Sequence, residues 1–247
     1  MKLSAEERDR YARHILLKEI GGPGQQRLKT ARVAIVGAGG LGAPAALYLA
    51  AAGVGSIRLI DHDTVALSNL QRQIIFEAGD VGASKVERAA AALEALNANV
   101  SIEPRAERLD AANARQVLDG VDLVLDGTDV FATRFAVNEA CHALGITLIS
   151  GAVGRWSGQV AAFAPEGPCY RCFVPETPPD AETCERVGVV GALTGVIGSM
   201  MALEAIKHIT EAGQTLAGRI MLFDGLSAEA RTVKLARDPA CPVCGDE

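Results

Sequence analysis

A glycine-rich turn restricts the fold of this chain more than any other part of its sequence. Residues 32 to 53 read "RVAIVGAGGLGAPAALYLAAAG", so an apolar run of strand length leads directly into glycines and then into an Ala-rich helical pattern. The spacing G-x-G-x-x-G is typical of a strand, a tight turn and a helix that together hold the phosphates of a nucleotide, because glycine lets backbone N–H groups approach the phosphate. The predicted phosphate-binding glycines are Gly37, Gly39, Gly40 and Gly42.

Apolar runs of strand length alternate with helical patterns up to residue 150. This alternation predicts an α/β fold with a Rossmann-like, doubly wound sheet whose N-terminal half is parallel. Three later runs are separated by tight turns, and we expect them to continue the same mixed sheet as antiparallel strands. The predicted strands are 32–36, 56–60, 100–104, 121–126, 146–150, 158–165, 219–225 and 229–236, and the predicted helices are 41–52, 84–97, 110–118 and 131–144.

At 247 residues the chain has the size of one large α/β domain, and we expect a single domain over residues 1–247. It begins with a helical arm, 1–30, which should be broken by the sequence GGPG at 21–24. A nucleotide-binding half, 31–150, follows the arm, and a C-terminal half, 151–247, completes the domain.

Two segments of the C-terminal half have unusual compositions. Residues 166–188 are rich in Pro, Glu and Thr and are expected to be the most mobile part of the chain. Residues 187–203 are uncharged, contain a GxxxG pair from Gly191 to Gly195, and reach the lower length limit of a membrane span. Because Glu204 follows at once and no second apolar segment of that length occurs, we expect a buried or interface helix and no membrane anchor.

The charge balance bears on partners and on location. A formal net charge of −6 and a pI near 5.3 argue against broad electrostatic binding of nucleic acid or of an anionic membrane. The N-terminal sequence MKLSAEERDRYARH is charged and lacks the apolar core of a signal peptide, so a cytoplasmic location is expected.

Polar side chains after the second predicted strand indicate which nucleotide is bound. Asp61 ends that strand, where a carboxylate can accept hydrogen bonds from ribose hydroxyls. The donors Asn69, Arg72 and Lys85 follow it, and Asp129 lies just after the fourth predicted strand, where a carboxylate can hold Mg²⁺. A triphosphate under attack needs such cations and a metal, whereas a dinucleotide needs little beyond the glycine turn. The sequence therefore predicts ATP and Mg²⁺ as cofactors.

An NAD-dependent oxidoreductase is the alternative that the glycine turn and Asp61 would support by themselves. No Tyr-x-x-x-Lys pair occurs, and the four histidines have no evident carboxylate partner, so this alternative lacks a recognisable acid–base group. A Walker-type P-loop is excluded because no Gly-Lys dipeptide occurs. Binding of a nicotinamide cofactor without binding of ATP would identify the redox enzyme.

Two C-x-x-C pairs provide four thiolates, enough for a closed tetrahedral Zn²⁺ site of structural type. The pairs are Cys169 with Cys172 and Cys241 with Cys244, and such a site would tie the C-terminal tail to the loop after the sixth predicted strand. Disulfide bonding is the alternative for these four residues. Cys141 falls on the apolar side of a predicted helix and is expected to be a core residue.

Segments spread over essentially the whole chain match one family. They are RYARH at 10–14, GAGGLG at 37–42, DHDTVALSNLQRQ at 61–73, GASK at 82–85, TDVFATRFAVN at 128–138, CYRC at 169–172, GVIGSMMALEAIK at 195–207 and CPVC at 241–244. With them the chain resembles the MoeB/ThiF family of sulfur-carrier-protein adenylyltransferases, which are related to ubiquitin-activating enzymes. The resemblance implies ATP-dependent adenylylation of the C-terminal glycine of a ubiquitin-like carrier ending in Gly-Gly, with release of pyrophosphate, in molybdopterin or thiamine biosynthesis.

The resemblance also implies roles for individual residues and partners. The carrier would bind the C-terminal half, zinc would occupy the four cysteines of the C-x-x-C pairs, and a separate cysteine desulfurase or rhodanese would supply sulfur. Arg13 would reach across a homodimer into the partner's nucleotide site. Within one chain, the implied nucleotide ligands are Asp61 for the ribose, Asn69, Arg72 and Lys85 for the phosphates, and Asp129 for Mg²⁺, with Asp63 as a further cofactor-binding residue.

Two positions leave the implied chemistry open. Cys184 matches a cysteine that forms a covalent link with the carrier or the sulfur donor in some relatives and is dispensable in others, so its catalytic role is an open alternative. Val130 stands where many relatives have Asn, but Arg134 and Asn138 keep their spacing, so only a local change of hydrogen bonding is expected. Two further alternatives are a tRNA-modifying relative with the same adenylation chemistry and a non-catalytic nucleotide-binding scaffold.

Overall fold

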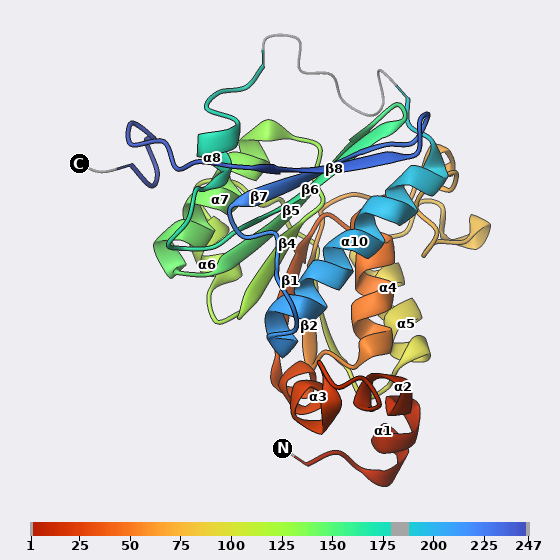
Figure 1. Cartoon of the computed structure of the whole chain (residues 1–247). Coiled ribbons are helices and arrows are strands. Elements are labelled where there is room, and N and C mark those ends of the chain that lie inside the picture. The colour runs from red at the N-terminus through yellow and green to blue at the C-terminus, as the bar shows by residue number, and fades with distance from the viewer. Residues whose placement is uncertain (1, 179–187, 246–247) are drawn as a thin grey trace.

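The protein is built on one eight-stranded mixed sheet, as the alternation of apolar runs predicted (Figure 1). The computed structural model describes residues 2–178 and 188–245. The strand order is β3-β2-β1-β4-β5-β6-β7-β8, with parallel pairing from β3 to β5 and antiparallel pairing from β5 to β8. The strands are β1 (Arg32–Val36), β2 (Ser56–Ile60), β3 (Ser101–Arg105), β4 (Leu123–Asp126), β5 (Thr147–Gly154), β6 (Ser157–Phe163), β7 (Arg219–Asp224) and β8 (Glu229–Lys234).

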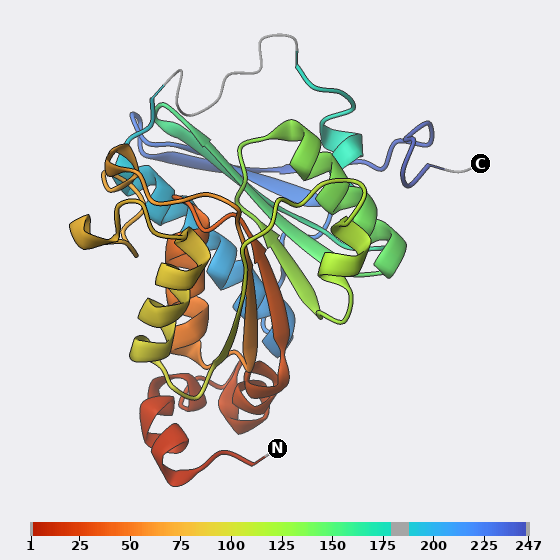
Figure 2. The same cartoon turned by 180° about the vertical axis from the view of Figure 1, so that it is seen from behind.

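Helices cover both faces of the sheet (Figure 2). On one face α10 packs on α4, β5 and β6, while on the other α7 packs on β4, β5 and α6. The helices are α1 (Ala5–Arg10), α2 (Ala12–Ile15), α3 (Gly21–Thr30), α4 (Gly42–Ala52), α5 (Lys85–Leu96), α6 (Ala114–Leu118), α7 (Phe131–Leu144), α8 (Tyr170–Phe173) and α10 (Gly191–Thr210), with short 3₁₀ turns η1 (Leu67–Asn69) and η2 (Ala78–Asp80).

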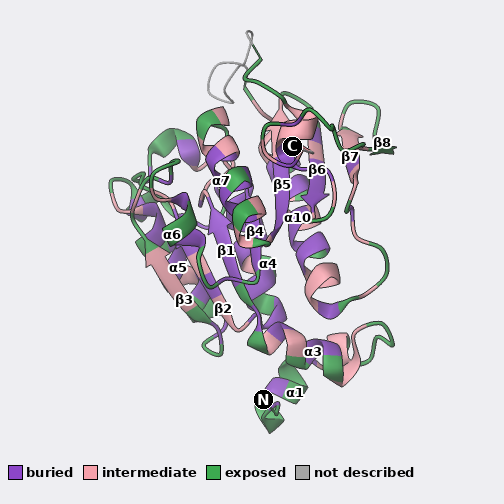
Figure 3. Ribbon diagram, turned by 90° about the vertical axis from the view of Figure 1, so that its left-hand side faces the viewer, coloured by how far each residue is buried: buried purple, intermediate pink, exposed green. Residues whose placement is uncertain are grey.

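The sheet separates two apolar cores, because successive residues of a strand point to opposite faces. In β1, Val33 and Ile35 belong to the core under α4 and α10, whereas Ala34 and Val36 belong to the core under α6 and α7. Figure 3 shows the result, with buried residues concentrated in the central strands. All residues of β8, at one edge of the sheet, are exposed.

The first strands and the main helices lie where the sequence predicted them, but strand β5 is longer. It runs on to Gly154 and forms a hairpin with β6 through Arg155 and Trp156, with Arg155 at a φ of 52°. The prediction ended this strand at 150. Gly151 lets Met201 pack closely on the continued strand, since a Cβ at this position would lie 2.4 Å from the sulfur of Met201.

The predicted break in the helical arm is wrong. The sequence GGPG at 21–24 forms the first turn of α3, and the chain turns before it, at residues 16–20. Pro23 is tolerated because N–H groups of the first helical turn have no partner within the helix. Tertiary packing also favours this helix, because Leu28 and Gln25 are fully buried in it.

By length and composition alone, helix α10 could cross a membrane. In this fold it covers one face of the sheet instead. Of its most apolar 18-residue window, 44% is buried, against α4 and the sheet. Gly191 and Gly198 make the close approaches of this helix. A Cβ on them would lie 2.3 Å from the Gln71 carbonyl oxygen and 2.5 Å from the Leu41 carbonyl oxygen, whereas Gly195 has open space.

Candidate nucleotide and metal sites

A cavity of about 500 Å³ opens at the carboxyl ends of β1, β2 and β4. The strand order reverses between β1 and β4, and the crevice at such a reversal is the usual ligand site of doubly wound sheets. Residues predicted from the sequence come together around it from five separate segments of the chain. They are Gly37, Gly39, Gly40, Asp61, Asp63, Asn69, Arg72, Lys85 and Asp129.

The glycine turn is tight enough to require its glycines. Gly37 has a φ of 89°, in the region that favours glycine. Gly42 does not line the cavity; a Cβ on it would lie 1.8 Å from the carbonyl oxygen of Gly37, so it allows the turn to close. Asp61 fixes the turn to the end of β2, because its carboxylate accepts hydrogen bonds from the backbone N–H of Ala38 at 2.8 Å and of Asp63 at 2.9 Å.

Lys85 lies in the cavity wall, where it forms an ion pair. Its Nζ lies 2.8 Å from Oδ2 of Asp63, and the lysine side chain is only 7% exposed. Burial alone would raise the pKa of Asp63, but the hydrogen bond and charge of Lys85 outweigh it, so the pKa of Asp63 is lowered. The pair therefore keeps a buried ammonium beside the glycine turn, where an anionic ligand can compete for it.

Asn69 and Arg72 line the same cavity from the turn after β2. The Asn69 side chain accepts a hydrogen bond from the Ala66 backbone N–H at 3.1 Å and its backbone carbonyl accepts from Gln73, so it holds the turn together. Arg72 is half-buried, and its Nη1 donates to the Ser68 carbonyl at 3.2 Å. The guanidinium keeps further N–H groups for a ligand.

Asp129 is exposed at the cavity mouth, on a loop that is held from both sides. Asp126 is buried and its Oδ1 accepts from the Thr128 backbone N–H at 2.9 Å and hydroxyl at 2.7 Å. Arg134 is also buried and donates to the carbonyl oxygens of Thr128 and Gly151. Burial alone would lower the pKa of Arg134, but the charge of Asp126 contributes to a raised pKa, so the guanidinium stays charged. Val130 is exposed, as is Asp129.

Sequence reasoning gave no role to Gln73 and Arg108, which also line the cavity. Gln73 is 4% exposed, and its Oε1 has no hydrogen-bond partner among the described residues. Its position in the run from 61 to 73 was the available signal. Arg108 lies beyond β3, and its charge contributes to the lowered pKa of Asp63; nothing in the surrounding sequence marked it.

Arg13 does not line the cavity of its own chain. It is exposed on α2, in an arm that packs at the far end of α4 from the glycine turn (Figure 1). Tyr11 fixes this arm: a Cβ on Gly53 would lie 2.3 Å from the tyrosine ring, and Asn97 Nδ2 donates to the tyrosine hydroxyl at 2.8 Å.

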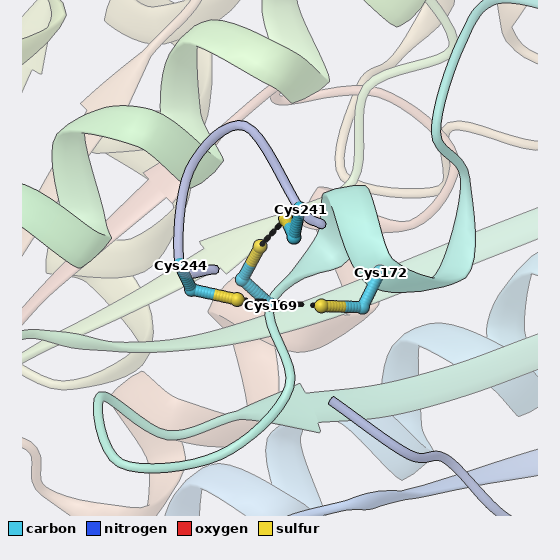
Figure 4. Close-up of side chains that lie close together, drawn as sticks. All are labelled: Cys169, Cys172, Cys241 and Cys244. Carbon is cyan, nitrogen blue, oxygen red and sulfur yellow. Dashed lines mark hydrogen bonds between the residues drawn. The ribbon is translucent and has the colours of Figure 1, made fainter. Parts of the chain in front are cut away.

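The four cysteines of the C-x-x-C pairs form a second cluster (Figure 4), and none of them lines the cavity. All four sulfurs lie within 4.8 Å of one another, and the Sγ–Sγ distances are 3.6 Å for Cys169 with Cys241 and 3.3 Å for Cys172 with Cys244. They are free thiols. Burial raises the pKa of Cys169 to about 12, whereas at Cys241 the backbone N–H groups of Cys244 and Val243 outweigh burial and lower the pKa to about 7.

The two remaining cysteines differ in how far they can be placed. Cys141 is 2% exposed in the core under α7, as the sequence predicted, and burial raises the pKa of its thiol. Cys184 lies outside the described residues, as does most of the second half of the 166–188 segment.

Comparison with known proteins shows which family the sequence matches. The model of the ThiF family matches residues 11–243. The chain is 45% identical over 248 residues to the SAMP-activating enzyme E1 of Haloferax volcanii, covering 100% of this chain and 92% of that protein. It is also 45% identical over 255 residues to the sulfur carrier protein adenylyltransferase of Thermus thermophilus, covering 100% and 94%.

Solved structures share the fold. The crystal structure of PaaA superimposes with a TM-score of 0.81 at 26% identity, over 94% of this chain and 75% of that one. A crystal structure of E. coli MccB gives a TM-score of 0.86 at 24% identity, over 96% and 75%.

Proposed function

The chain belongs to the ThiF family, and on this premise we propose that it is an adenylyltransferase that activates the C-terminus of a ubiquitin-like sulfur-carrier protein with ATP. The observation that carries the proposal is the convergence of a glycine turn, Lys85, Arg72 and Asp129 on one cavity. An NAD-dependent oxidoreductase and a tRNA-modifying relative are not favoured, because two relatives matched over more than nine tenths of their length are named a SAMP-activating enzyme and a sulfur carrier protein adenylyltransferase.

In the proposed reaction the carrier's terminal carboxylate attacks the α-phosphate of ATP, and pyrophosphate leaves. No nucleophile from the enzyme is needed for this step, so catalysis comes from alignment and from neutralising phosphate charge. We assign Asp61 to the ribose, the N–H groups of the glycine turn to the phosphates, and Asn69, Arg72 and Lys85 to the charge that develops on them. On ATP binding, Lys85 would exchange part of its contact with Asp63 for a phosphate oxygen.

A divalent cation fits the donor set of the cavity. Asp129 supplies exposed carboxylate oxygens, which together with phosphate oxygens are the ligands that Mg²⁺ prefers. When bound, Mg²⁺ would offset the charge of the leaving pyrophosphate. Asp126 and Arg134 would position Asp129 by fixing Thr128 beside it.

The carrier's tail would reach the cavity along the antiparallel part of the sheet. A groove of about 840 Å³ lies over β5 to β8, and Val153 lines both this groove and the nucleotide cavity. The two spaces therefore adjoin, and an extended tail in the groove would place its carboxylate at the nucleotide. We assign nucleotide binding chiefly to residues 31–150 and carrier binding to residues 151–247, with Val153, Val189 and Thr194 of the second half also lining the nucleotide cavity.

A homodimer would complete the site with the partner's Arg13. The arm holds Arg13 away from its own cavity, and exposed apolar side chains on the arm and on the α4–α10 layer offer a surface for a second copy. These side chains are Leu16, Leu17, Tyr48 and Leu203.

The cysteine cluster fits a structural zinc ion. A Zn–S distance of about 2.3 Å in a tetrahedron gives S···S distances of about 3.8 Å, close to the 3.3 and 3.6 Å found between the paired sulfurs. Four thiolates leave no open position on the ion, so zinc would stabilise the fold by tying the C-terminal tail to α8.

We assign the protein to the cytoplasm. A separate donor would supply sulfur to the adenylylated carrier, and Cys184 is a candidate for a covalent link during that transfer of sulfur.

The test is ATP–pyrophosphate exchange with a panel of small proteins ending in Gly-Gly. We expect one of them to stimulate Mg²⁺-dependent exchange, and a copy without its last glycine to be inactive. Absence of exchange with every such carrier, in protein that binds ATP, would refute the assignment of a carrier protein as the acceptor.

A further inference from the structure

Helix α7 contacts both sites through two side chains one helical turn apart. Arg134 donates to the Gly151 carbonyl at 2.9 Å and to Thr128, in the loop that carries Asp129. Asn138 is 2% exposed and faces the segment that carries the first cysteine pair. The helix thus contacts the loop of Asp129 through Arg134 and the segment of the first cysteine pair through Asn138.

The orientation of the Asn138 amide follows from its contacts. Its Oδ1 accepts a hydrogen bond from the Tyr170 backbone N–H at 2.7 Å, and a backbone N–H can only donate. The other side of the amide must therefore be the NH₂ group, and its Nδ2 lies 3.6 Å from Sγ of Cys169. A buried sulfur of the cluster is thus paired with a donor from a neighbouring helix.

Such a donor matters for a metal held by four thiolates. A Zn²⁺ ion with four thiolate ligands has an excess of negative charge, and N–H groups aimed at the sulfurs offset it and orient them. Asn138 provides a side-chain N–H donor to the sulfur of Cys169, which also lies 3.6 Å from the sulfur of Cys241.

We propose that Asn138 is a positioning residue for the metal, which holds the Cys169 thiolate in its ligating orientation and fixes the cluster to α7. This inference rests on the zinc site proposed above. The alternative role, bonding to Tyr170 alone, would contribute to stability but would not act on the metal.

Asn138→Asp separates the two roles. The carboxylate has nearly the same shape and still accepts from the Tyr170 N–H, but it presents an oxygen to the thiolate in place of a donor. We expect zinc transfer from the folded enzyme to a colorimetric chelator to be about 10- to 100-fold faster than in the wild type. In Co²⁺-substituted protein we expect the thiolate-to-cobalt charge-transfer band to shift.

Glu139→Gln is the matched control, because Glu139 is the exposed neighbour of Asn138 on the same helix. Asn138→Ala, which removes donor and acceptor together, should release zinc faster as well and serves if the Asp variant does not fold. Unchanged zinc transfer and an unchanged cobalt band in a folded Asn138 variant would overturn the inference. A wild-type protein that contains no zinc and takes up no Co²⁺ would instead refute the zinc site itself, whatever the outcome for adenylation.

Discussion

Lys85 lies in the wall of the nucleotide cavity because Asp63 pairs with it there. An ammonium with so little exposure needs a partner, and Asp63 compensates its charge while no anion is bound. The same relation applies at the mouth of the cavity, where Asp126 and Arg134 hold the loop of Asp129. At both places a charged side chain in the cavity wall acts together with an oppositely charged side chain beside it.

Replacing Lys85 by Met tests its role, because Met retains much of the aliphatic stem and removes the cation. We expect ATP–pyrophosphate exchange to fall by about 100- to 1,000-fold, the usual loss when one donor to a developing charge is removed. Arg88→Met is the control, because Arg88 lies on the same helix, pairs with Asp80 at 2.5 Å and does not line the cavity. Exchange within about twofold of the wild type in Lys85→Met would show that the cation is not needed.

The individual site residues differed in how well the sequence could predict them. Glycines in a fixed spacing, and charges at strand ends, mark a nucleotide site because their local context is diagnostic. Gln73 had only its place in the polar run from 61 to 73 as a signal and Arg108 had none, and both reach the cavity through the path of the turns that carry them. The burial of Arg134 beside Asp126 likewise depends on how α7 packs on β4.

Among the elements, the arm is held by contacts distant in sequence. Ser4 and Glu7 form a capping box at the start of α1, and Lys29 Nζ lies 2.7 Å from the buried Glu7 carboxylate. The Lys29–Glu7 pair joins α1 to α3, while Tyr11 joins the arm to α4 and α5 through Asn97. The orientation of Arg13 therefore depends on this packing.

Acid should weaken the arm before it unfolds the sheet. The hydrogen bond from Lys29 lowers the pKa of Glu7 below its ordinary value of 4.5, so the stability that Glu7 contributes is complete above that value and is lost as the pH falls through the lower folded value. We expect hydrogen exchange of α1 amides to speed up, relative to that of the central strands, as the pH falls below 4.5. In Glu7→Gln this pH dependence should be absent, and an equal dependence in both proteins would contradict the assignment.

The order and kind of the elements were more predictable than their ends. Periodicity placed β1, β2 and α7 correctly, because short apolar runs bounded by polar turns are typical of buried strands and a helical period is typical of the helices between them. The continuation of β5 past Gly151 and the start of α3 at Gly21 follow instead from tertiary packing. Glycine, read from the sequence alone, indicates a break, whereas here it permits close contact with Met201.

At the scale of the whole molecule, the location of Arg13 makes a second copy part of the proposed mechanism. Arg13→Ala and Asp129→Ala should each be inactive as homodimers. After their subunits are exchanged, about half the dimers pair one chain of each kind, and each of these has one complete site, so about a quarter of the wild-type activity should return. The measurement is adenylation after mixing, with each variant alone as the control. No recovery, in samples shown to have exchanged subunits, would place Arg13 in the site of its own chain, and an active Arg13→Ala homodimer would place it outside any site.

The adjoining cavities also have a consequence for which acceptors are admitted. On the proposed route the last residues of the incoming polypeptide must pass Val153, the wall shared by both spaces. On that route a chain end without side chains would fit beside Val153, whereas a bulky end would be hindered there before it reached the nucleotide. Selectivity for two terminal glycines would then come from the fit of the tail at Val153 and would be independent of the adenylation reaction itself.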